Sequence, residues 1–329
     1  MKTLRSILLY FVIAVATVVV VLSLLSLVYD VSYWYTKVLD FPRTQYLIVA
    51  VACLLLLVPL MRRWNAAATA LMLGLTATVL IQGWDVAPYL IGPREVPDAE
   101  AGGDNAVSIM LANVLITNRQ SDAFLNIVSN TAPDLLLVME NDRWWEEQLT
   151  VLDRTYPHSV KYPAGNGYGM TLFSRLPLAD NETLFFNQDS VPSFHVRVTL
   201  PSGAAFTFHA MHPVAPVPSK EYPDNKGEKE VAFGKLADLL ARDSLPVIVA
   251  GDFNDVSWSH TSRLFQDAGN LSNVRLGRGL YNSFDATSWY MRWPLDHYFV
   301  SGQWGVARLE RLPAFGSDHF PMYAEFVLR

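Results

Sequence analysis

Polar residues that could do metal or acid–base chemistry follow short apolar stretches in the second half of this 329-residue sequence. Five places share the pattern: Glu140 follows 135–139, His212 follows 206–211, Asp252 with Asn254 follows 247–250, Asp296 follows 293–295, and Asp318 with His319 follows 315–317. Short apolar runs are typical of strands buried on both faces. A carboxylate at the end of such a strand loses hydration, which costs free energy unless a cation or hydrogen-bond donors compensate it. The pattern therefore predicts strands that converge on a common cationic centre.

The residue types at these positions indicate a hard divalent cation and acid–base catalysis. Oxygen donors dominate, and the single cysteine, Cys53, excludes a multi-cysteine zinc or iron–sulfur site. Mg²⁺ and Mn²⁺ prefer oxygen ligands, and histidines titrate near neutral pH. Taken singly, each residue is more often a turn residue or a helix N-cap than a ligand. The prediction therefore depends on all five places together.

The order of these motifs resembles that of one known superfamily. The motifs are Asn113, Glu140, His212, Gly-Asp252-Phe-Asn254, Leu-Asp296-His-Tyr-Phe and Gly-Ser-Asp318-His319-Phe-Pro. They resemble the endonuclease/exonuclease/phosphatase superfamily, which includes pancreatic-type deoxyribonucleases, abasic-site endonucleases, neutral sphingomyelinases and inositol polyphosphate phosphatases. The resemblance covers residues 106–329 and implies an α/β (α+β) fold, a four-layer sandwich of two mixed β-sheets flanked by helices.

The resemblance also implies which residues hold metal and substrate. Glu140 would be the main metal ligand, Asn113 would lie beside the metal or a phosphate oxygen, and Asp318 would be a further ligand or its support. Asp252 and Asn254 would hold the attacking water or the scissile phosphate, and Asp252 could bind a second cation.

Proton transfer is implied for the two histidines. His319 would act as general base or stabilise charge on the phosphate, with Asp296 fixing its tautomer, and His212 would protonate the leaving oxygen. Hydrolysis of a phosphate ester needs neutralised charge, a deprotonated water and a stabilised leaving group. The sequence thus predicts a Mg²⁺- or Mn²⁺-dependent hydrolase of phosphate esters.

Strands that could position these residues alternate with a few helices. Predicted strands cover 107–115, 135–139, 169–174, 195–200, 205–211, 246–250, 295–301 and 322–328, and predicted helices cover 122–129 and 229–242. This alternation indicates an α/β or α+β layered domain. Asp255 is predicted to cap the following helix, and His297 should point to the opposite face of its strand from Asp296.

Three uncharged runs precede this domain, at 6–29, 44–61 and 64–84. Each reaches the roughly 17–25 residues that cross a membrane, and no polar face interrupts them. They predict a membrane domain over 1–84 with three transmembrane helices, followed by a linker over 85–105. A cleaved signal peptide is the alternative for the first run, although that run exceeds the ~7–15 residues of a signal h-region. Arg62 and Arg63 lie in a connection so short that the second and third helices should form an antiparallel hairpin.

Basic residues near the runs predict the orientation in the membrane. Such residues prefer the cytoplasmic side of a membrane. An N-terminus on the cytoplasmic side places four of them there, Lys2, Arg5, Arg62 and Arg63, and three on the outer side, Lys37, Arg43 and Arg94. The excess of one predicts a multi-pass protein of the cell membrane, with a cytoplasmic N-terminus and an extracytoplasmic catalytic domain.

The net charge and the domain architecture limit the classes of substrate to be expected. Six of the 25 basic residues and two of the 31 acidic ones precede residue 83, so the remainder carries about −10, which disfavours nucleic acid as a partner. The architecture resembles bacterial membrane proteins linked to teicoplanin resistance, which implies a phospholipid or lipid-linked substrate. The leading hypothesis is a membrane-anchored phosphoesterase for phosphodiester, phosphomonoester or pyrophosphate bonds. An exported metal-dependent nuclease and a non-catalytic membrane binding protein are the alternatives.

Overall fold

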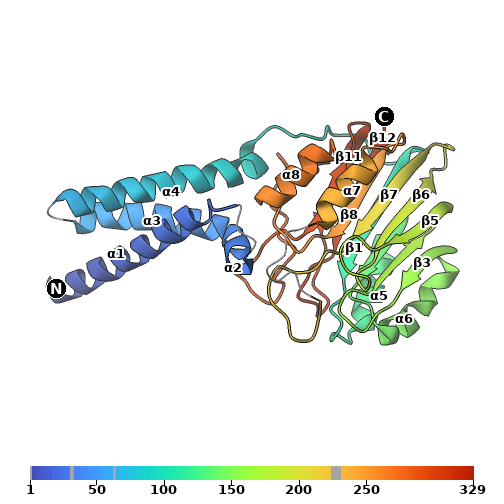
Figure 1. Ribbon diagram of the computed structural model, residues 1–329, viewed down its shortest axis with the longest axis horizontal. Helices are drawn as coiled ribbons and strands as arrows, with labels where there is room; N and C mark the ends of the chain where they lie inside the picture. The colour runs from blue at the N-terminus through green and yellow to red at the C-terminus, as the bar shows by residue number, and fades with distance from the viewer. Residues whose placement is uncertain (1, 30–32, 62–63, 224–230) are drawn as a thin grey trace.

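The protein has two parts, an N-terminal bundle of helices and a larger layered domain (Figure 1). The computed structural model describes residues 2–29, 33–61, 64–223 and 231–329. The predicted connection at Arg62 and Arg63 lies outside the described residues, as do the first two positions of the predicted helix 229–242.

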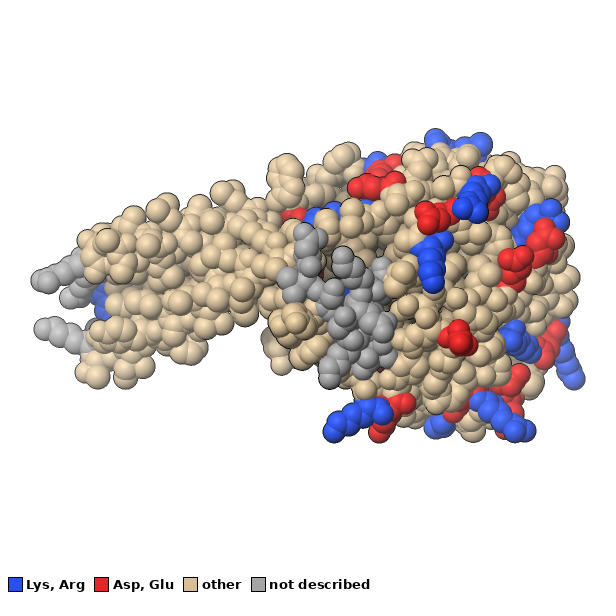
Figure 2. Space-filling view, viewed as in Figure 1, with Lys and Arg blue, Asp and Glu red and all other residues tan. Residues whose placement is uncertain are grey.

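The bundle contains three helices long and apolar enough to span a membrane, α1 (Lys2–Leu25), α3 (Arg43–Leu60) and α4 (Ala66–Ile91). The short helix α2 (Trp34–Lys37) and the 3-10 turn η1 (Val38–Asp40) precede α3. Small and branched side chains such as Ala16, Ala50 and Leu75 pack between the helices. Other apolar side chains face outwards, so the bundle surface is almost free of charge, whereas acidic and basic residues intermingle on the layered domain (Figure 2).

The end of α4 differs from the prediction. The helix continues to Ile91 because the charge of Asp85, which ends the third uncharged run, is buried and paired with Arg43 at 2.7 Å and with Arg263 at 2.6 Å. The segment that follows is also less like a tether than its composition indicates. Val96 is buried in the core of the layered domain, and Ala99 donates its N–H to the Val306 carbonyl at 3.0 Å.

The layered domain is a sandwich of two six-stranded mixed sheets, as the resemblance implies. The first sheet has the order β11 (Trp304–Arg311), β12 (Met322–Leu328), β1 (Ala106–Asn113), β2 (Leu135–Met139), β4 (Met170–Ser174) and β3 (His158–Tyr162). The second has the order β5 (Leu178–Leu184), β6 (Ser193–Thr199), β7 (Ala205–Met211), β8 (Val247–Asp252), β10 (Asp296–Val300) and β9 (Ser272–Asn273). Neighbours are parallel in β1–β2 and β7–β8 and antiparallel elsewhere in both sheets.

Alternating side chains divide the core into layers. On β1, Val107 and Ile109 face a central core that they share with Phe194 and Phe206 of the second sheet, while Met110 points to the other side. This period of two is what a strand buried on both faces produces. Four helices and a 3-10 turn complete the domain: α5 (Ser121–Thr131), α6 (Arg143–Leu149), η2 (Thr150–Arg154), α7 (Ala232–Leu240) and α8 (His260–Ala268). Side chains of α5 and α6 pack on the outer face of the first sheet, and those of α7 and α8 on that of the second.

The strands that sequence patterns missed are all edge strands. β3 and β11 are the edges of the first sheet, and β5 and β9 are those of the second. An edge strand is partly exposed to solvent and tolerates polar residues, so it lacks the apolar run by which the central strands were predicted. The central strands β2 and β7 match their predicted ranges to the residue.

Candidate active site

Strand register brings the predicted polar residues to one end of the sandwich. In the first sheet Asn113 is paired with Met139, which directly precedes Glu140. In the second sheet Asp252 is paired with Asp296 across β8 and β10. The two sheets also touch here, because the backbone N–H of Asp252 lies 3.2 Å from the sulfur of Met139. Segments far apart in the sequence therefore meet in one place.

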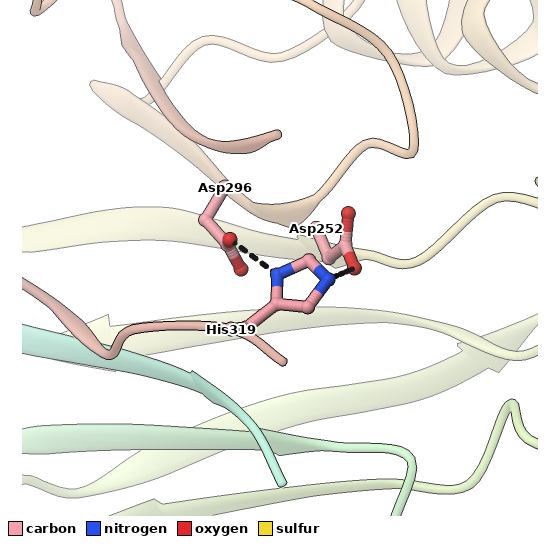
Figure 3. A group of neighbouring side chains, drawn as sticks. All are labelled: Asp252, Asp296 and His319. Atoms are coloured by element: carbon pink, nitrogen blue, oxygen red, sulfur yellow. Dashed lines mark hydrogen bonds and ion pairs between the residues drawn. The ribbon is translucent and has the colours of Figure 1, made fainter. Parts of the chain in front are cut away.

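His319 lies between two buried carboxylates (Figure 3). Its Nδ1 is 2.8 Å from Oδ2 of Asp296, and its Nε2 is 3.5 Å from Oδ2 of Asp252. Burial alone would lower the pKa of His319, but the negative charges of Asp296 and Asp252 outweigh this effect and raise it to about 10. The imidazole is therefore held as a cation that points at the centre of the site.

His212 approaches the same carboxylate from the other side. Its Nε2 lies 3.7 Å from Oδ2 of Asp252, and the ring of Tyr168 packs against it at 4.9 Å between centroids. Burial lowers the pKa of His212 to about 4, despite the attraction of Asp252. At neutral pH His319 therefore carries a proton and His212 does not, which suits His319 for stabilising negative charge and is the reverse of what the roles of general base for His319 and proton donor for His212 require.

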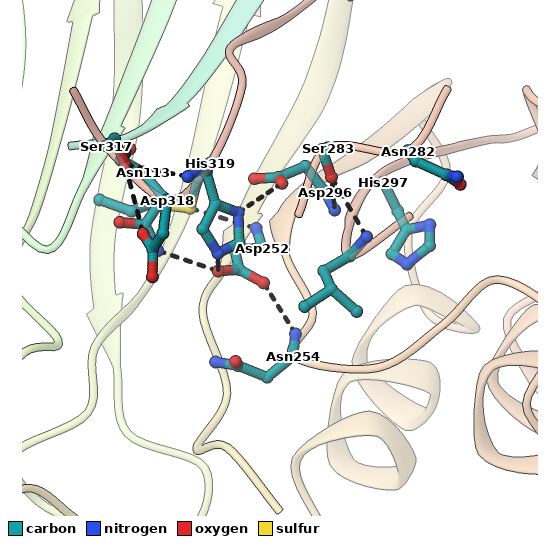
Figure 4. Close-up of polar contacts among 12 residues, drawn as sticks. Asn113, Asp252, Asn254, Asn282, Ser283, Asp296, His297, Ser317, Asp318 and His319 are labelled. Atoms are coloured by element: carbon teal, nitrogen blue, oxygen red, sulfur yellow. Dashed lines mark hydrogen bonds and ion pairs between the residues drawn. The ribbon is translucent and has the colours of Figure 1, made fainter. Parts of the chain in front are cut away.

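Asn113 joins the carboxylates of the two sheets, and Figure 4 shows its contact with Asp252. Its Nδ2 donates to Oε1 of Glu140 at 2.8 Å and to Oδ2 of Asp252 at 3.0 Å, while its Oδ1 accepts the N–H of Leu115 at 3.0 Å. The amide nitrogen, not the oxygen, therefore faces the acids. Asn254 donates its backbone N–H to Oδ1 of Asp252 at 2.9 Å, and its side chain donates to the Pro213 carbonyl.

The backbone around the site adopts conformations that most residues avoid. Glu140 and Asn254 have φ values of +60° and +50°, in the left-handed region, which is costly for non-glycine residues and concentrated at functional sites. Gly251 has φ +149°, and a Cβ there would lie 1.9 Å from the carbonyl oxygen of Met211. The close approach of β7 to β8 beside the site thus requires glycine.

The charge of the cluster fits a divalent cation. Burial raises the pKa of Glu140 to about 7 and also raises the pKa of Asp318, because the charged carboxylates lose water. One ligand atom from each of Asp252, Asp296 and His319 lies within 4.8 Å of the others, and of these three only Asp252 is among the predicted metal ligands. Several buried carboxylates with one imidazolium leave excess negative charge, and oxygen donors of this kind suit a hard cation such as Mg²⁺.

Four neighbours of the site were not identified as site residues from the sequence. Ser317 accepts the N–H of His319 at 3.1 Å and donates to the Asn113 carbonyl at 2.8 Å, so it fixes the loop between β11 and β12 to the end of β1. Ser283 accepts the N–H of Asp296 at 3.1 Å, and the Phe284 ring packs on His319 at 5.0 Å. The fourth, Tyr168, contacts His212. Ser317 lies inside a motif named above and Tyr168 directly precedes the predicted strand 169–174, whereas Ser283 and Phe284 carry no sequence signal.

Two further predictions concern the residues after Asp252 and Asp296. Asp255 is not the N-cap of α8, because Ser259 caps that helix and Asp255 accepts the Ser259 hydroxyl at 2.5 Å. His297 points away from Asp296 as expected. It contacts the Asp255 carbonyl at 2.8 Å and a buried guanidinium, that of Arg275, at 2.8 Å.

Comparison with known proteins agrees with this geometry. The Endonuclease/Exonuclease/phosphatase family model matches residues 110–319, a range that includes every predicted site residue. No curated protein matches the chain.

Solved structures share the fold at low sequence identity. The human Nocturnin catalytic domain with bound sulfate anion is 19% identical, with 72% of this chain and 97% of that chain covered and a TM-score of 0.55. D. rerio TDP2 complexed with single strand DNA product is 16% identical, with 68% and 99% covered and a TM-score of 0.53. An endonuclease/exonuclease/phosphatase from Bacteroides vulgatus is 18% identical, with 68% and 99% covered and a TM-score of 0.52.

Proposed function

This chain belongs to the Endonuclease/Exonuclease/phosphatase family, and on that premise we propose that it is a membrane-anchored, divalent-metal-dependent phosphoesterase whose substrate is a phospholipid or a lipid-linked phosphate. Members of the family are hydrolases that act on phosphate esters. The bond would be a phosphodiester, a phosphomonoester or a pyrophosphate.

The residues of the site divide the chemistry among them. Asp252 faces both histidines and is placed to orient the attacking water. His319, charged and fixed by Asp296, would stabilise negative charge on the phosphate. A divalent cation such as Mg²⁺ or Mn²⁺, held by Glu140 with Asp318 or Asp252, would neutralise phosphate charge and favour deprotonation of water.

The observation that carries the proposal is the contact of the catalytic loops with the bundle. Trp258, four residues after Asn254, donates its Nε1–H to the Asp40 carbonyl at 2.7 Å. The ring of Trp293, three residues before Asp296, packs against Phe41 at 5.8 Å. Both partners lie just before the start of α3. An active site held beside the ends of membrane spans meets lipid head groups at a high local concentration.

A pocket between the two parts supports the same interpretation. Asn254 and Asp255 line it from the catalytic side, and Tyr29, Lys37 and Asp40 line it from the bundle side. A substrate that enters here would touch the domain and the membrane end of the bundle together.

The orientation is part of the proposal. The distribution of basic residues supports a multi-pass protein with a cytoplasmic N-terminus and the layered domain outside the cell membrane. A Val151→Cys variant tests this, since Val151 is exposed and the native Cys53 is buried. Labelling of intact cells with an impermeant maleimide should reach Val151→Cys; protection until the cells are lysed would place the domain in the cytoplasm.

Hydrolysis by the purified full chain tests the activity. The detergent-solubilised protein with Mg²⁺ should release phosphate or a head group from at least one member of a panel of phospholipids and polyprenyl phosphates. Chelation and His319→Ala should both abolish the release. Efficient cleavage of DNA without release from any lipid would reject the lipid substrate.

A nuclease is the second candidate, because one structural neighbour is D. rerio TDP2 in complex with a single strand DNA product. The surface argues against it, since acidic and basic side chains are mixed on the visible face of the domain (Figure 2). Plasmid degradation that falls steeply with added salt would favour the nuclease. If the unmodified protein hydrolyses no substrate and His319→Ala binds lipid as the unmodified protein does, a non-catalytic binding protein would be favoured.

A further inference from the structure

The loop between Phe284 and Trp293 exposes three consecutive large apolar side chains. Trp289 is 85% exposed, Tyr290 60% and Met291 36%. Of the described large apolar residues in the layered domain, Trp289 is the most exposed. Isolated apolar residues are normal on a protein surface, whereas a contiguous group indicates a surface that binds something. We call residues 285–292 the aromatic loop.

The base of the aromatic loop is attached to the active site. The ring of Phe284 packs on that of His319, and its backbone N–H donates to the Trp293 carbonyl at 2.9 Å while its carbonyl accepts the N–H of Trp293. Ala286 donates its N–H to the Asp318 carbonyl at 2.7 Å. The loop is therefore held beside the catalytic histidine, and anything that binds its tip lies next to the site.

The tip of the aromatic loop contacts the bundle. Nε2 of Gln45 donates to the Tyr290 carbonyl at 2.9 Å, and Gln45 lies in the first turn of α3. The same end of α3 is joined to α4 by the ion pair between Arg43 and Asp85. Tyr290 therefore lies close to the level of Asp85 along the bundle.

That level coincides with a candidate membrane boundary. Trp84, adjacent to Asp85, is 83% exposed on α4, and Trp64 is 56% exposed near the other end of the helix. Trp64 lies just before α4, and the helix rises by about 27 Å from its start at Ala66 to Trp84, close to the roughly 30 Å thickness of the hydrocarbon core. Tryptophan and tyrosine favour the two interfaces of a bilayer. The aromatic loop is thus at the depth of the Trp84 interface.

We infer that the aromatic loop inserts Trp289, Tyr290 and Met291 into the surface of the bilayer that the bundle spans. The lipid surface itself would be the partner of this loop, and its insertion would fix the catalytic histidine at head-group level. The inference rests on the proposed membrane anchoring, but it concerns binding and does not require that a particular lipid be hydrolysed.

Site-directed labelling tests the insertion directly. The full chain carrying Cys53→Ala and Trp289→Cys, labelled with an environment-sensitive fluorophore, is reconstituted in vesicles of phosphatidylcholine and phosphatidylglycerol. The label should emit at shorter wavelength than in water and be quenched by lipids with spin labels near the head group. Val151→Cys is the matched control, because Val151 is an apolar residue, 59% exposed, that follows α6 at the far end of the domain (Figure 1). Equal, water-like emission and no quenching at both positions would overturn the inference.

A ratio of rates tests the consequence for catalysis. Trp289→Ser with Tyr290→Ser should lower hydrolysis of a vesicle-embedded phospholipid relative to that of a soluble phosphodiester by roughly tenfold, since two aromatic side chains no longer leave water. Val151→Ser should leave the ratio unchanged. A ratio unaffected by the loop variant would contradict a role in catalysis at the membrane. Absence of hydrolysis in the unmodified protein would instead refute the proposed function, while the labelling result still decides the insertion.

Discussion

Two buried clusters of charged side chains lie close together in this protein and differ in their charge balance. In the first cluster, at the end of the bundle, each charge has a partner of opposite sign: Arg43 contacts Asp40 and Asp85, and Asp85 also contacts Arg263 at 2.6 Å. Gln82 accepts a further hydrogen bond from Arg43 at 3.0 Å. Two arginines and two aspartates leave no excess charge.

The second cluster is the candidate active site, and it is not balanced. Glu140, Asp252, Asp296 and Asp318 lie around His319, which is held as a cation, and the buried Arg275 beside Asp296 adds one further positive charge, so the four carboxyl groups outnumber the two cations. Breaking a balanced buried pair leaves an uncompensated charge and destabilises a protein. An unbalanced cluster already carries that cost and retains the capacity to bind a cation. The comparison teaches that burial of charged groups alone does not identify a functional site. An excess of buried charges of one sign does, because it can bind an ion of the opposite sign.

The largest expected effect is the loss of activity in His319→Ala. Removal of a group that stabilises charge or transfers a proton should slow hydrolysis by ~10²–10⁴-fold, measured with a soluble phosphodiester and Mg²⁺. His158→Ala, a half-buried histidine on β3, is the control and should keep its rate. If His319→Ala lowered the rate of hydrolysis by less than tenfold, His319 would not be a catalytic residue.

The balanced cluster should respond in stability. Arg43→Met leaves Asp40 and Asp85 without their shared partner, so the free energy of unfolding should fall by about 3–5 kcal/mol. Chemical denaturation of the detergent-solubilised chain, followed by circular dichroism, measures the change. Arg5→Met should cost less, because Arg5 contacts the Pro59 and Leu60 carbonyls and no acid. Equal stability of the two variants would show that the cluster is not structural.

Binding of Mg²⁺ should distinguish the two clusters, because only the active-site cluster has excess negative charge. At a Mg²⁺ concentration 100 times its dissociation constant, the unfolding free energy should rise by about 2.7 kcal/mol. Glu140→Gln should lose most of this gain because a ligand oxygen with negative charge is removed, whereas Glu182→Gln, on the exposed strand β5, should keep it. The thermal midpoint with and without Mg²⁺ gives the comparison. If Mg²⁺ raised the thermal midpoint of Glu140→Gln as much as that of the unmodified protein, Glu140 would not be a ligand of the cation.

The smallest effect concerns a buried histidine outside both clusters. Burial, with the nearby His195, lowers the pKa of His209 to about 3, so the folded state stays unprotonated there while the unfolded chain takes up a proton below its ordinary value of 6.5. Stability from this group is therefore complete above pH 6.5 and decreases as the pH falls towards 3. Between pH 7 and 5 its share of the loss is about 2 kcal/mol. His209→Phe should flatten the curve of unfolding free energy against pH by that amount, and an unchanged slope would contradict the assignment.

Local sequence patterns predicted the central strands and the approximate spans because each reports the burial of an uninterrupted apolar run. They also predicted which residues converge, since a polar residue at the end of a buried strand marks the edge of a sheet. They failed where a residue's partner is distant in sequence. The charge of Asp85 predicts the end of the third apolar helix, yet Arg43 and Arg263 neutralise this charge and α4 continues to Ile91. Asp255 precedes α8 as a cap would, but Ser259 is closer to the first turn.

By itself the sequence determined the family, the residue types that gather at the candidate site and the presence of long apolar helices, because these depend on motifs and on local periodicity. The tertiary structure alone decided that Asn113 turns its nitrogen to the acids, that Ser283 and Phe284 support Asp296 and His319, and that the tip of the aromatic loop contacts Gln45 of α3. Such features depend on contacts between residues far apart in the chain, whose free energies no local pattern records.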